Sequence, residues 1–198
     1  MRSFWSEPFL WIHLAGLTAV PIFLGICFLG LTAGEPILPI WLEIFLVAVV
    51  GITPVLGMQI LRPFYIFSIL ALAIKPEQLN EQQRRLLSQF KTKVNRVVAV
   101  LAAVFMLLVL IQIYDATPAV ASFAPFLPQS HNLGLMLACV AFLLGNLFLQ
   151  IPVSVALVVL TDEAKLAATE PYEVERISQD FTIPGWRVNR ILPSMVEE

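Results

Sequence analysis

Residues 91–113 read KTKVNRVVAVLAAVFMLLVLIQI, and this stretch decides the class of fold. After a basic flank, the run from Val97 to Ile113 contains Gln112 as its single strongly polar residue. A helix of about 20 mostly apolar residues is long enough to cross the hydrocarbon layer of a bilayer. The stretch therefore predicts a transmembrane helix over 97–114, with a cluster of cations at one of its ends.

Three further apolar runs predict spans at 9–31, 37–61 and 133–160. The chain is 59% hydrophobic and 13% charged, with a mean hydropathy of +0.85, whereas soluble domains carry about 25% charged residues. The first run is longer than the hydrophobic region of a signal peptide, so we interpret it as a retained helix. These features predict an all-α integral membrane protein whose four-helix domain covers 1–160, with a cytoplasmic C-terminal tail over 161–198.

The connection between the second and third spans, residues 62–96, has two parts. Phe64–Ile74 is apolar but has about half the length that a crossing requires, which predicts an interfacial or re-entrant half-helix. A second helix is expected to start near Pro76, because proline is tolerated in a first turn. Its apolar residues recur at helical spacing up to Phe90 and Val94, which predicts a cytoplasmic amphipathic helix.

The positions of the basic residues predict the orientation. All twelve Lys and Arg fall on one side of a four-span arrangement, and the two opposite connections contain none. The cations are Arg2, Arg62, Lys75, Arg84, Arg85, Lys91, Lys93, Arg96, Lys165, Arg176, Arg187 and Arg190. By the positive-inside rule this side is cytoplasmic, so both termini are expected there.

His13 and Glu43 are ionisable residues inside predicted spans, which makes them candidate functional residues. One interpretation makes either of them a pigment ligand or a proton carrier. The other places each near its own membrane interface, where a polar head reaches water, with the two residues too far apart to act together. A third ionisable residue, His131, falls in a proline-rich outer connection and is expected to be exposed.

One face of the fourth predicted span consists of small residues at steps of four, three and four: Gly134, Ala138, Ala141 and Gly145. Another helix, from this chain or from a partner, or a flat ring can approach such a face closely. Helix packing is the preferred interpretation.

The basic run after the half-length segment is a candidate site for anionic lipid headgroups, at about 1 kcal/mol per residue near the surface. The residues are Arg84, Arg85, Lys91, Lys93 and Arg96. An ordinary cytoplasmic flank of a span is the equally weighted alternative.

Several function classes lack support. The net charge of −2 provides no basic field for nucleic acid. Cys27 and Cys139 form no CxxC or Cys/His cluster, so the sequence suggests neither a zinc site nor a disulfide framework. Motifs of nucleotidases, metalloproteases and serine hydrolases are absent from the sequence, so we expect no enzymatic activity.

Three segments resemble a family of cyanobacterial membrane proteins described by their low-complexity tail. They are Arg2–Trp11 (RSFWSEPFLW), Arg62–Ser68 (RPFYIFS) and Lys75–Leu79 (KPEQL). The resemblance implies a thylakoid or cell membrane and a role beside the photosynthetic complexes. It transfers no functional residue, because the segments contain no catalytic motif.

The first functional hypothesis is therefore a non-enzymatic accessory subunit or assembly factor that docks on a larger membrane complex such as a photosystem. The proline-interrupted spans leave a small transporter or channel component as an alternative. A pigment- or quinone-binding protein that uses His13 or Glu43 is another, with chlorophyll or carotenoid as candidate cofactors. Membrane lipids are expected partners in every case, because four apolar helices have to face them.

Overall fold

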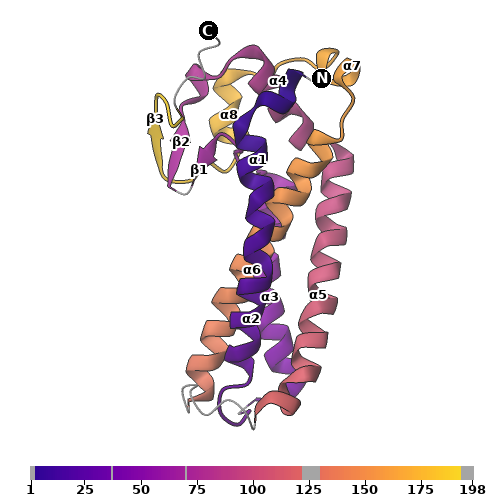
Figure 1. Ribbon diagram of the computed structural model, residues 1–198, viewed down its shortest axis with the longest axis vertical. Helices are drawn as coiled ribbons and strands as arrows, with labels where there is room; N and C mark the ends of the chain where they lie inside the picture. Colours follow the sequence, from indigo (N-terminus) through magenta and orange to yellow (C-terminus); the bar gives the residue numbers. More distant parts are fainter. Residues whose placement is uncertain (1–2, 37, 70, 122–129, 193–198) are drawn as a thin grey trace.

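The computed structural model describes residues 3–36, 38–69, 71–121 and 130–192. Four long apolar helical spans run along the molecule (Figure 1). The first consists of α1 (Pro8–Ala15), a 3-10 turn η2 (Gly16–Ala19) and α2 (Val20–Leu31); the others are α3 (Ile40–Leu61), α5 (Lys93–Ala121) and α6 (His131–Val159). Arg2, Ile37 and the end of the tail at 193–198 lie outside the described residues.

All four spans are long and apolar enough to cross a membrane, with mean hydropathies of 2.2, 2.3, 2.8 and 2.1 in chain order. The α6 helix is the central one. Within its most apolar window 56% of the residues are buried, against 22%, 22% and 28% in the other spans. In the other three spans most residues of this window are thus exposed or partly exposed, as in helices that face lipid.

The closest helix contact joins α2 to α6 and is made by glycines. A Cβ added to Gly30 would lie 2.6 Å from the carbonyl oxygen of Gly134 and 2.9 Å from the amide of Ala138. A Cβ on Gly134 would in turn collide with the Gly30 carbonyl. Small residues at a membrane-helix interface allow this backbone approach. The small-residue face of α6 therefore packs inside this chain, against α2.

One end of the bundle carries a folded extension, which we call the cap. It contains η1 (Ser3–Ser6), the strands β1 (Ser68–Ile69) and β2 (Leu72–Ile74), η3 (Pro76–Gln78), α4 (Glu81–Phe90), α7 (Glu163–Ala167), α8 (Val174–Asp180) and β3 (Trp186–Val188). Figure 1 shows the sheet at one side of the cap, beyond the outline of the helices. We call the opposite end, with the connections α2–α3 and α5–α6, the loop end.

The half-helix predicted for Phe64–Ile74 is wrong. In the described part of this segment the chain forms β1 and β2, which pair antiparallel, and β2 pairs in parallel with β3. Helix α3 ends at Leu61 because Pro63 disfavours a helical conformation at Arg62, whose φ and ψ are −138° and 78°. The backbone then finds distant partners: Tyr65 N–H donates to Thr182 O at 3.0 Å.

The helix that follows is shorter than the sequence pattern indicated. It begins at Glu81, because Asn80 and Gln83 form a reciprocal capping box there. It ends at Phe90, and two residues separate it from α5, which starts at Lys93. Leu86, Leu87 and Phe90 are buried on its inner side.

The cap has an aromatic core that is continuous with the bundle. Tyr65, Phe67 and Phe181 are fully buried and belong to one cluster with Phe9 of α1 and Val155 of α6. The Tyr65 hydroxyl donates to Ile74 O at 2.9 Å, which ties the hairpin together. The cap and the adjacent halves of the first and fourth spans therefore share a core.

Candidate functional site

At the loop end, a carboxylate lies buried among three spans. Glu43 is in the first turn of α3 and has no exposed surface. Its Oε1 lies 2.7 Å from His131 Nε2, at the first residue of α6. Its Oε2 accepts a hydrogen bond of 2.9 Å from the Tyr114 hydroxyl of α5. The Leu38 amide also donates to Oε1, at 3.3 Å.

The hydrogen-bond partners assign the protons of this cluster. His131 Nδ1 lies 2.8 Å from the carbonyl oxygen of Ala33, which can only accept, so Nδ1 carries a hydrogen. The second imidazole nitrogen then shares one proton with the Glu43 carboxylate. The pair is thus either imidazolium with carboxylate or neutral imidazole with carboxylic acid, and both arrangements have zero net charge. Zero net charge makes burial tolerable, because an unpaired charge in an apolar interior costs several kcal/mol.

The hydrogen bonds of this cluster join the spans to one another, and the cluster does not form an open binding site. Glu43, Tyr114 and His131 connect α3, α5 and α6, and the Ala33 carbonyl adds the segment that follows α2. The adjacent interior is filled by apolar side chains, including Leu110, Leu135, Ala138 and Phe142. Among the residues that the structure describes, no three His, Cys, Asp or Glu lie close enough to hold a metal ion.

Glu43 thus has a partner that the sequence analysis did not assign to it. The expectation that His131 is exposed is wrong, because it starts α6 and has 3% of its surface exposed. The two residues are 88 positions apart, and proline-rich sequence precedes His131. Both oxygens of Glu43 already accept hydrogen bonds, so a pigment metal would have to displace His131 or Tyr114.

His13 lies near the cap, at the other end of the bundle from Glu43 (Figure 1). Its Nε2 lies 2.8 Å from the carbonyl oxygen of Ile66 and therefore carries a hydrogen. Its ring meets Phe64 edge to face, with centroids 5.5 Å apart. His13 also lines an apolar cavity of about 370 Å³ between α1, α6 and the cap, with Gly16, Phe148 and Pro152.

The basic residues proposed for lipid headgroups divide into two groups. Three are bonded inside the cap: Arg84 donates to Tyr172 O at 3.4 Å, Arg85 to Ala167 O at 2.5 Å, and Lys91 to Asp180 at 3.0 Å. The other two, Lys93 and Arg96, are exposed in the first turn of α5. The second group is therefore the better placed to meet lipid.

The Asp180 carboxylate of α8 organises the polar side of the cap. Its Oδ2 accepts a 2.6 Å hydrogen bond from the Tyr172 hydroxyl, and its Oδ1 pairs with Lys91. These two hydrogen bonds hold the pKa of Asp180 below its ordinary value of 3.8. Burial, together with the adjacent carboxylate, raises the pKa of Tyr172 to about 12. The ion pair between Asp180 and Lys91 links α8 to the end of α4.

A second carboxylate, Glu7, fastens the start of the chain to the cap. Gln83 Nε2 of α4 donates to Glu7 Oε2 at 3.0 Å. Burial raises the pKa of the Glu7 carboxyl above its usual value.

The fold has four helices that are long and apolar enough to cross a membrane, an internal polar cluster and a cap built from separated chain segments. These features define a multispanning membrane protein. Residues 6–193 match the model of one protein family, described as low-complexity tail membrane protein-like. The chain belongs to this family. No curated protein and no solved structure matches it.

Proposed function

We propose that the protein is a non-enzymatic accessory subunit or assembly factor that docks through its cap on a larger membrane complex. The observation that carries the proposal is the exposed aromatic edge of the sheet. Trp186 is 75% exposed and Leu72, its register partner on β2, is 41% exposed. Tryptophan is one of the residues that contribute most of the binding energy in protein interfaces.

The edge is also geometrically suited to a partner. In the described sheet β3 is an end strand, paired only with β2, so its outer backbone groups face away from the sheet. Gly185 turns the chain into β3 with φ of 63°, and the Trp186 amide donates to Ala71 O at 2.7 Å. Trp186 and Arg187 are therefore presented on a fixed backbone.

The proposed cellular setting is supported by the charge pattern and by the resemblance of three sequence segments to cyanobacterial proteins. The eleven Lys and Arg among the described residues lie at the cap side of the four spans, which supports a cytoplasmic cap by the positive-inside rule. The resemblance to cyanobacterial proteins supports a thylakoid membrane, with a photosystem as the first complex to test.

Purification in mild detergent followed by native electrophoresis and mass spectrometry tests the proposal. We expect the chain to migrate with a larger complex, and Trp186→Ala to release it. Trp41→Ala is the matched control, because Trp41 is 68% exposed but lies at the loop end, at the start of α3. A wild-type chain that migrates alone in every mild detergent would contradict docking. Equal release by both variants would contradict the assignment to the cap.

The cavity beside His13 favours a second candidate function, the binding of a ring-bearing apolar molecule such as a quinone, chlorophyll or carotenoid. Its walls combine Phe148, Pro152 and Ile69 with one imidazole, the composition typical of small-molecule sites. Leu147→Trp, which fills the cavity, should remove any quinone or pigment that co-purifies with the wild type. Solvent extracts without such a compound would exclude this candidate.

A further inference from the structure

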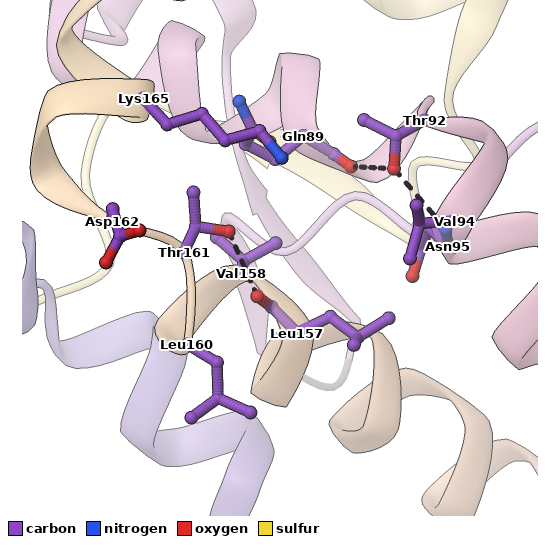
Figure 2. A pocket seen from close by; sticks show the side chains of 10 residues that line it. All are labelled: Gln89, Thr92, Val94, Asn95, Leu157, Val158, Leu160, Thr161, Asp162 and Lys165. Carbon is purple, nitrogen blue, oxygen red and sulfur yellow. Dashed lines mark hydrogen bonds between the residues drawn. The ribbon is translucent and has the colours of Figure 1, made fainter.

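A pocket of about 250 Å³ lies where the cap meets the bundle, and Figure 2 shows the side chains that line it. Its walls come from the end of α4, the start of α5, the end of α6 and α7. The polar lining residues are Gln89, Thr92, Asn95, Thr161, Asp162 and Lys165, and the apolar ones are Val94, Leu157, Val158 and Leu160. The pocket is thus polar on the cap side and apolar on the bundle side.

The polar side is suited to an anion. In Figure 2 the Lys165 side chain extends from α7 toward Gln89, which places its ammonium over the pocket. Helix α5 begins beside the pocket at Lys93. In its first turn the Asn95 amide donates to Thr92 Oγ1 at 3.3 Å, and the amides that precede it attract negative charge. Lys93 and Arg96 add exposed cations in the same turn.

Asn95 supplies a second, independent indication of a ligand. It is 3% exposed, and its Nδ2 donates to Phe90 O at 2.9 Å. Its Oδ1 is buried and receives no hydrogen bond from the part of the chain that the structure describes. A buried oxygen without a donor destabilises the fold, so a ligand hydroxyl or N–H that donates to this atom would bind favourably.

The apolar side continues onto the lipid-facing surface. Val94 is 62% exposed and Leu160 is 72% exposed, both at the cap ends of their spans. A molecule whose polar part occupied the pocket would therefore lie with an attached hydrocarbon chain along α5 and α6. This geometry matches a phospholipid at the membrane interface.

We propose that this pocket binds the headgroup of an anionic phospholipid that carries a free hydroxyl, as phosphatidylglycerol does. Lys165 and the start of α5 hold the phosphate, a headgroup hydroxyl donates to Asn95 Oδ1, and the acyl chains cover Val94 and Leu160. Asp162 also lines the pocket, and in Figure 2 its carboxylate lies on the opposite side of Thr161 from Asn95. The site does not depend on the docking proposed above.

Native mass spectrometry of the full chain, after exchange into mixtures of phosphatidylglycerol, phosphatidylethanolamine and phosphatidylcholine, tests the proposal. We expect preferential retention of phosphatidylglycerol. Lys165→Ala should reduce this retention about fivefold, the equivalent of about 1 kcal/mol for one cation near the surface. Arg187→Ala is the matched control, because it removes the same charge from an exposed position on β3 outside the pocket.

Two ligand comparisons examine the chemistry without altering the fold. Phosphatidylmethanol keeps the phosphate but lacks a free hydroxyl, so it should be retained less than phosphatidylglycerol; equal retention would overturn the role given to Asn95. Inorganic phosphate should not displace the lipid, and displacement would overturn the assignment to a membrane lipid. Equal retention of all three natural lipids, preference for phosphatidylethanolamine, or equal losses in the Lys165 and Arg187 variants would overturn the site itself.

Discussion

Replacing Glu43 by leucine should destabilise the loop end of the bundle severely, whereas replacing it by glutamine should not. Leucine removes the acceptor of Tyr114 and the partner of His131, which leaves two buried polar groups unsatisfied. Each costs about 1–3 kcal/mol, and breaking a buried charge pair costs about 3–5 kcal/mol in total. We therefore expect a loss of about 3–5 kcal/mol in the free energy of unfolding for Glu43→Leu.

Glutamine can satisfy the same partners. Its amide oxygen can accept from Tyr114, and its NH₂ can donate to His131 Nε2, because the Ala33 carbonyl keeps the hydrogen of this histidine on Nδ1. The remaining loss is the shared contact with the Leu38 amide, so Glu43→Gln should cost about 1 kcal/mol. The difference between the two variants reports how much the hydrogen bonds at position 43 contribute to stability.

The measurement is unfolding in dodecylmaltoside micelles with increasing SDS, followed by circular dichroism. Glu35→Leu is the control, because Glu35 is exposed on the connection between α2 and α3. The double variant Glu43→Leu/His131→Leu should lose less than the sum of the single losses, with a coupling of about 1–2 kcal/mol. If Glu43→Leu unfolded within about 0.5 kcal/mol of the wild type, or if the single losses added fully, the cluster would not act as described.

Three further outcomes are expected. Gly30→Ala should destabilise the protein by about 1–3 kcal/mol in the same assay, because the new Cβ meets the α6 backbone. Gly25→Ala on the same helix is the control and should be tolerated, because a Cβ at this position has no atom within 4 Å. Equal effects of the two variants would refute the contact. The folded-state pKa of Asp180 is lowered, so its carboxylate stabilises the fold above its ordinary pKa of 3.8, and this stabilisation is lost as the pH falls through and below that value. In acid unfolding curves Asp180→Asn should therefore lose less stability than the wild type as the pH falls. Acid curves identical to those of the wild type would contradict the pairing. In sealed thylakoid vesicles, which expose their cytoplasmic face, an impermeant maleimide should reach Glu175→Cys but not Glu35→Cys, both exposed positions; the reverse pattern would contradict the proposed orientation.

The spans were predictable because lipid imposes a length and an apolarity that a sequence displays directly. The predicted first, second and fourth spans match their helices within three residues at each end, whereas α5 extends beyond the predicted 97–114 on both sides. The end of α3 also follows from the local chemistry of Arg62-Pro63. These features depend on neighbouring residues only.

The cap and the polar cluster were missed because their partners are distant in sequence. Arg62 donates to the Ser178 carbonyl 116 residues away, and the hairpin after it depends on β3 for its outer pairing. Strands of two or three residues are too short to show an alternating sequence pattern, and here the partner strand β3 lies far from them in the sequence. Glu43 and His131 likewise show no spacing that would link them before the spans are packed.

The dependence of β2 on β3 has a consequence for biosynthesis. The ribosome completes residues 64–74 before it has made α5 and α6, and it makes β3 near the end of the chain. Until then Tyr65 and the hairpin lack the hydrogen-bond acceptor at Thr182 and the aromatic cover of Phe181. A nascent chain that stalls before residues 181–188 therefore keeps an apolar hairpin uncovered, the kind of surface that chaperones and proteases recognise. Synthesis of this segment supplies the hydrogen-bond acceptor, the aromatic cover and the strand partner that the hairpin lacks until then.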